Sequence, residues 1–99
     1  MPRYDLHRIP RGGGYLLNLQ HDLHAHLSTR VVAPLLPAAG APPPARGLNP
    51  QFELEDGPHI LFPQFMAAVP KRELGPVVGT LDAHRDDITR ALDLLLTGF

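Results

Sequence analysis

The placement of proline constrains the fold of this chain more than any other feature, because all 12 prolines precede residue 82. Proline lacks a backbone N–H and clashes with the preceding helical turn, so helix interiors and central strands exclude it. The 9 glycines add further turn signals between short apolar runs. We therefore expect short β-strands and turns over residues 1–81 and a helix only in the proline-free end.

The apolar runs of the β region predict strands joined largely by tight turns. Residues 4–9 and 15–20 flank a glycine-rich turn and favour a first hairpin, and residues 51–55 and 59–62 flank Asp56-Gly57-Pro58 and favour a second. Residues 31–36 form another apolar run, in which Pro34 is expected at a sheet edge or bulge. Further short apolar stretches occupy residues 65–70 and 74–81.

The proline-rich segment 37–44 reads PAAGAPPP and is expected to be an extended, exposed loop. Its consecutive prolines could dock in the aromatic groove of a partner, but a plain linker is favoured because no PxxP pattern with a flanking arginine is present.

The end of the chain predicts an amphipathic helix over residues 82–96, followed by a tip at residues 97–99. Asp82 is expected to cap the helix N-terminus, and Gly98 to stop the helix. Ile88, Leu92 and Leu95 follow helical spacing and are expected in the core. The predicted fold is therefore mainly β with a C-terminal α-helix, in one domain spanning residues 1–99.

Composition excludes several classes of function. The chain has no cysteine, which rules out disulfides and thiolate chemistry, and its scattered basic residues with a net charge of −1 make nucleic acid an unexpected direct partner. No run of apolar residues is long enough to span a membrane, and no signal peptide is evident, so a cytoplasmic location is expected. A chain this short keeps exposed apolar surface, which favours a homodimer.

No pattern of catalytic residues stands out, and we expect the protein not to be an enzyme. Ser28 is the only serine and lacks a nucleophile context. The acidic pairs Glu53/Glu55 and Asp86/Asp87 are explained by a solvent-facing strand and by a helix N-terminus. No cofactor is predicted.

His21, His24 and His26 form the one group that suggests a metal. On an extended segment His24 and His26 would point to the same face, as imidazole ligands require. Solvated histidines in a loop are the preferred interpretation, and a metal-responsive β-domain stays a minor alternative.

The spacing of several motifs resembles the CcdB family of toxins over nearly the whole chain. The combination consists of R-x-V-x-P-L at residues 30–35, M-A-x-V-P at residues 66–70, and a terminal helix that ends in glycine and an apolar residue. Other matching residues are Tyr15, Gln20, Asp22, Leu48, Asn49, Pro50, Leu81, Asp87, Ile88, Ala91, Leu92 and Gly98.

This resemblance implies a small SH3-like β-barrel or antiparallel sheet with a C-terminal helix, assembled as a homodimer. It implies a toxin of a plasmid-maintenance module that binds the A subunit of DNA gyrase and traps a cleaved complex, and that a CcdA-like antitoxin neutralises. Toxin and antitoxin together would repress their operon, with operator DNA contacted only through the antitoxin.

The family's gyrase contact usually ends in Trp-Gly-Ile, whereas this chain ends in Thr97-Gly98-Phe99. Losing a buried aromatic anchor costs about 2–4 kcal/mol, so a non-toxic relative that still binds antitoxin is the alternative. Asp93 stands where the family commonly has Asn, and His21 and His24 replace small or apolar residues. The gyrase-binding residues implied by the resemblance are Leu23, His24, Asp93, Leu96, Thr97, Gly98 and Phe99.

Overall fold

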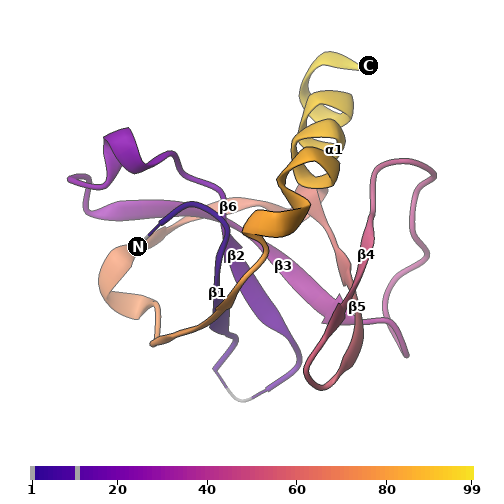
Figure 1. The fold of residues 1–99 in the computed structure, drawn as a ribbon, viewed down its shortest axis with the longest axis horizontal. Helices are drawn as coiled ribbons and strands as arrows, with labels where there is room; N and C mark the ends of the chain where they lie inside the picture. Colours follow the sequence, from indigo (N-terminus) through magenta and orange to yellow (C-terminus); the bar gives the residue numbers. More distant parts are fainter. Residues whose placement is uncertain (1, 11) are drawn as a thin grey trace.

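A computed structural model describes residues 2–10 and 12–99 of the chain. Strands fill the first four-fifths, as predicted, and one α-helix ends the chain (Figure 1). The strands are β1 (Asp5–Arg8), β2 (Tyr15–Asn18), β3 (Thr29–Pro37), β4 (Gln51–Leu54), β5 (Gly57–Leu61), β6 (Ala67–Pro70) and β7 (Val77–Thr80). Short 3-10 turns are η1 (Asp22–His24), η2 (Pro63–Phe65), η3 (Lys71–Glu73) and η4 (Asp82–His84), and the helix is α1 (Arg85–Thr97).

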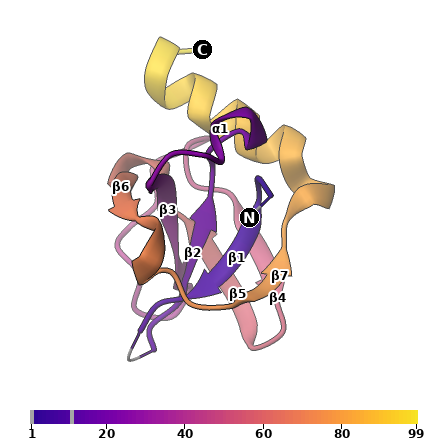
Figure 2. The same cartoon turned by 90° about the vertical axis from the view of Figure 1, so that its left-hand side faces the viewer.

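The strands form one antiparallel sheet in the order β4-β5-β3-β2-β1-β7, with β6 paired to β3 off this path. Both predicted hairpins are present, since Arg8 pairs with Tyr15 across the first turn and Leu54 with Gly57 across the second. Figures 1 and 2 show that the sheet curls, so its two faces are a concave core side and an outer side. The fold is therefore a half-barrel, in which no ladder joins the described residues of β4 to those of β7.

Pro34 is expected at a sheet edge or a bulge, and the edge is wrong, because β3 is the central strand of the sheet. Pro34 pairs with β2, and on its other side β3 pairs with β6 up to Val32 and with β5 from Leu35. The Pro34 carbonyl accepts a hydrogen bond from the Phe62 N–H at 3.0 Å, so the proline nitrogen points to that same side. The missing donor thus lies opposite Phe62, whose carbonyl accepts instead from the Phe65 N–H at 3.0 Å, so this carbonyl still has a partner.

Helix α1 packs its buried residues Ile88, Ala91 and Leu92 over the concave face of the sheet. They join a core that includes Leu17, Leu35 and Leu61, each with no exposed surface, together with Phe52 and other strand residues. The prediction that Leu95 belongs to this core is wrong, since Leu95 is only half-buried. The last turn of α1 extends beyond the sheet, as Figure 1 shows, and so it has little to pack against.

The start of the helix also differs from the prediction. Asp82 opens the 3-10 turn η4, and α1 begins at Arg85 with no side-chain cap. The Thr80 hydroxyl accepts a hydrogen bond from the Asp82 N–H at 3.1 Å, so a threonine, which sequence reasoning did not select, holds the entry to the helix. Asp86 and Asp87 lie in the first turn, where their charge complements the helix dipole as expected.

Residues 38–50 connect β3 to β4 in a largely exposed loop, in agreement with the prediction for the proline-rich segment. In the described part of the chain, no helix has both the length and the apolar character needed to cross a membrane.

Candidate partner-binding surface

The end of α1 presents an exposed apolar tip. Leu96 is 67% exposed and Phe99 is 92% exposed, although both are large hydrophobic residues. Asp93, Thr97 and Gly98 are exposed beside them, so every residue predicted at the helix end lies on the surface. A side chain as apolar as Phe99 gains free energy when a partner removes it from water.

The tip has a defined backbone because Gly98 and Thr97 terminate the helix together. Gly98 adopts the left-handed conformation at a φ of 86°, and its N–H donates to the Leu94 carbonyl at 3.0 Å. The Thr97 hydroxyl lies 2.6 Å from the Asp93 carbonyl oxygen and 3.1 Å from that of Phe99. Gly98 thus stops the helix as predicted, and the single proton of the Thr97 hydroxyl can be donated to one of these two carbonyl oxygens at a time.

A second exposed element is the loop between β2 and β3, where Leu23 is 77% exposed and Leu27 is 44% exposed. Gln20 bridges this loop to β3, because its side-chain nitrogen donates to the His24 carbonyl at 2.8 Å and its side-chain oxygen accepts from the Val31 N–H at 3.1 Å. The loop is therefore held in one shape while its leucines face solvent.

Arg30 provides the main support of this loop from beneath. It is only 1% exposed, and its guanidinium donates to the carbonyl oxygens of Leu27, Thr29 and Ala25 at 2.7 to 2.8 Å. No ion pair to an acidic group is found for this arginine among residues 2–10 and 12–99. Main-chain carbonyl dipoles alone stabilise its charge, which ties the loop path to the arginine.

The histidine group does not adopt the extended geometry assumed for a metal site. His21 accepts a hydrogen bond from the Leu23 N–H at 3.0 Å, and the following residues form η1 rather than a strand. The ring centroids of His24 and His26 are 6.5 Å apart. No cluster of three or more potential ligands suited to a metal occurs among the described residues.

The two exposed elements project from the same end of the molecule but on different sides of it. Figure 1 shows η1 far from α1, while the turns of both hairpins lie at the opposite end. Leu23 and His24 therefore do not form one continuous patch with Phe99 within this chain. A partner that touches both elements must be large or must bind more than one copy of the chain.

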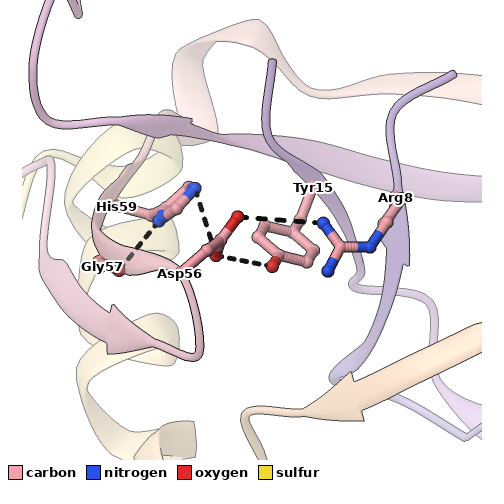
Figure 3. Close-up of polar contacts among 5 residues, drawn as sticks. All are labelled: Arg8, Tyr15, Asp56, Gly57 and His59. Atoms are coloured by element: carbon pink, nitrogen blue, oxygen red, sulfur yellow. Dashed lines mark hydrogen bonds and ion pairs between the residues drawn. The ribbon is translucent and has the colours of Figure 1, made fainter. Parts of the chain in front are cut away.

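A polar cluster at the hairpin end was missed by sequence reasoning. The Tyr15 hydroxyl donates to Asp56 at 2.7 Å, and the Arg8 guanidinium lies 3.8 Å from the same carboxylate (Figure 3). The bond from Tyr15 lowers the pKa of Asp56, and the same bond, with burial, raises the pKa of Tyr15. Since Tyr15 and Asp56 are 41 positions apart, no local pattern predicts their contact.

His59 completes this cluster from a sealed position, with its side chain 3% exposed. Its Nδ1 lies 3.0 Å from the Gly57 carbonyl, which can only accept, so Nδ1 carries the proton. Its Nε2 lies 4.0 Å from Asp56, as Figure 3 shows. The cluster joins the two hairpins and gives His59 little access to a bound substrate.

The model of the CcdB protein family matches residues 3–98. The chain belongs to the CcdB family. Its fold is also similar to that of an endoribonuclease solved in complex with its cognate antitoxin from a mycobacterial species, with a TM-score of 0.79 and 17% sequence identity over 98% of this chain and 95% of that chain. At this identity the likeness concerns the fold alone. Comparison with curated proteins found no significant match.

The residues that indicated the CcdB family have structural roles in this chain. Gln20 and Arg30 shape the exposed loop, and Asp22 accepts a hydrogen bond from the Arg3 N–H at 2.8 Å. Asn49 accepts from the Ala45 N–H at 2.7 Å and donates to the Leu61 carbonyl at 2.9 Å, which closes the proline-rich loop onto β5. The CcdB motifs thus specify the scaffold, whereas the exposed tip departs from the family pattern.

Proposed function

We propose that this protein is the toxin of a toxin–antitoxin module and that it inhibits DNA gyrase through the tip of α1. The observation that carries the proposal is the exposure of Leu96 and Phe99 on a helix whose opposite face is anchored in the core. An aromatic side chain held on a rigid support loses little conformational freedom on binding and makes an effective anchor. Membership of the CcdB family supports the A subunit of gyrase as the target.

The same proposal includes a CcdA-like antitoxin and a homodimer. Both are supported by the family, and the antitoxin also by the complex in which the similar endoribonuclease was solved. Exposed apolar residues outside the tip, such as Phe65, Val77 and Val78, supply surface that association would cover. Toxin and antitoxin would together repress their operon, with the antitoxin making the DNA contacts.

We further propose that the protein acts by binding and not by catalysis. The similar endoribonuclease makes RNA cleavage the rival hypothesis, and the Asp56 cluster is the group that such a reaction would have to use. His59 is nearly sealed, with one nitrogen bonded to the main chain and the other facing Asp56. This geometry supports a structural role for the cluster.

The test is induction of the protein in a bacterium without its antitoxin, followed by growth measurement and a gyrase cleavage assay with purified protein. We expect growth arrest and accumulation of cleaved DNA. Phe99→Ala should weaken gyrase binding about 30- to 1000-fold. Arg72→Ala removes an exposed side chain in η3, away from the tip, and should leave cleavage unchanged.

Three other outcomes decide between the alternatives. Normal growth at good expression favours a non-toxic relative that binds antitoxin and regulates its operon. RNA fragmentation without DNA breaks favours the endoribonuclease. Thr97→Trp restores the aromatic residue that the family usually carries and should increase toxicity if the tip contacts gyrase as proposed.

A further inference from the structure

The open side of the half-barrel forms a groove between the two terminal strands of the sheet. This groove has a volume of about 270 Å³ and is lined on one side by residues 53–55 of β4 and its turn, and on the other by residues 78–80 of β7. Leu6, Tyr15 and Leu81 also line it, and Ala83 and His84 line it before α1. Figure 2 shows β4 and β7 on the same side of the molecule, below the start of the helix.

The β4 edge of this groove has unpaired backbone groups. The Pro50 carbonyl accepts a hydrogen bond from the Leu61 N–H at 2.9 Å and so faces β5. Because backbone groups alternate in direction along a strand, those of Gln51 and Glu53 face away from β5. Glu53 pairs with Pro58, which has no N–H to donate, in agreement with this alternation.

The β7 edge presents one such position, Thr80. The Leu81 N–H donates to the Tyr4 carbonyl at 2.9 Å and so faces β1. By the same alternation, the backbone groups of Thr80 face away from β1, toward the groove, whereas a register shift between Leu6 and His7 interrupts the alternation at Val78. Exposed edge strands of this kind are templates for an additional strand.

The side chains of the groove specify what such a strand must carry. Leu6 and Tyr15 are each 4% exposed and belong to the core, so the inner face of an added strand would meet apolar surface. Glu53 and Glu55 are exposed beside the outer face. Arg8 is the cation in the groove, and it already lies 3.8 Å from Asp56. Apolar and basic residues in alternation fit this environment.

We propose that the groove between β4 and β7 binds an extended segment of a partner protein in which apolar and basic residues alternate. The segment adds a strand to the free edge of β7, places its apolar side chains over Leu6 and Tyr15, and places its basic side chains beside Glu53 and Glu55. This binding mode is separate from the α1 tip and does not depend on gyrase as the target.

The test uses the full chain and the capped hexapeptide VRVRVR, with VEVEVE as a charge-reversed control. Isotope-edited NMR should show saturable binding of VRVRVR, with slowed hydrogen exchange at the amide of Thr80. Glu53→Gln and Glu55→Gln should each weaken binding about 1.4- to 5-fold. Glu73→Gln alters an exposed glutamate that does not line the groove and should leave binding unchanged.

Each remaining outcome overturns the proposal. Equal binding of VEVEVE would remove the charge argument, and equal binding of a VRVRVR peptide with methylated backbone nitrogens would remove strand addition. Slowed exchange confined to β6 would place the site elsewhere. Slower hydrogen exchange at the Thr80 amide of the free protein as the protein concentration rises would show that a second copy of the chain occupies the groove.

Discussion

Replacing Arg30 with methionine tests how the exposed loop between β2 and β3 is held. The substitution keeps an unbranched side chain of similar length and removes the guanidinium that donates to the carbonyls of Ala25, Leu27 and Thr29. Hydrogen bonds from charged donors contribute about 1.5–3 kcal/mol each. Their sum is reduced by the cost of burying the charge, which is several kcal/mol.

We therefore expect Arg30→Met to lower the free energy of unfolding by about 3 kcal/mol, a large share of the 5–15 kcal/mol typical of small domains. For a chain of this length the corresponding fall in Tm is about 12–24 °C. Urea denaturation followed by circular dichroism measures the first quantity and calorimetry the second. Hydrogen exchange of the backbone amides should also accelerate in residues 21–28, because the hydrogen bonds from Arg30 to the carbonyl oxygens of this loop are lost.

Arg46→Met is the matched control, since Arg46 is exposed in the proline-rich loop. It should change the free energy of unfolding by less than about 0.5 kcal/mol. If Arg30→Met stays within that same limit, the guanidinium does not hold the loop and the reasoning is refuted.

Further predictions concern a close backbone approach and two carboxyl groups. Gly14→Ala should lower the free energy of unfolding by about 3 kcal/mol or more, because the new Cβ would clash with the Leu35 carbonyl oxygen and Gly14 has a φ of +128°. At Gly12 a new Cβ would meet nothing within 4 Å, so Gly12→Ala should cost only about 1 kcal/mol. Urea denaturation measures both values. The Tyr15 hydroxyl that donates to Asp56 lowers the pKa of this carboxyl below its ordinary value of 3.8. The ionised carboxylate therefore stabilises the folded protein above pH 3.8, and this contribution is lost as the pH falls through the pKa of the folded state. On acidification, the urea midpoint of Asp56→Asn should therefore fall less than that of the unsubstituted protein. Burial raises the pKa of Asp5, so the ionised form of this carboxyl destabilises the folded protein at neutral pH. Asp5→Asn should therefore raise the urea midpoint at neutral pH, and an unchanged midpoint would contradict this.

Local patterns predicted the parts of the fold that depend on neighbouring residues. The hairpin around Asp56-Gly57-Pro58 and the helix stop at Gly98 are both confirmed, because turn formation and helix termination are decided within a few residues. The direction of the Phe99 side chain, by contrast, did not follow from the sequence, because Gly98 ends the helix before it; the structure shows it 92% exposed.

The incorrect predictions for Pro34 and Leu95 involve the packing of distant segments. Pro34 is central and not at an edge because β5 and β6 share one side of β3, which no local rule anticipates. Leu95 has core spacing but lies where the helix has passed the sheet. The support of Arg30 for the exposed loop was likewise unpredicted, since a basic residue in an apolar run carries no sign of its burial.

The pairing of β1 with β7 has a consequence for synthesis on the ribosome. Asp5 of β1 pairs with Thr80 of β7, so β1 can pair with β7 only after residue 80 has been translated. The helix that covers the core, and the tip that it carries, emerge later still. The sheet therefore cannot close over its core until β7 and α1 have been made, so the early strands must wait for late segments before they can fold completely.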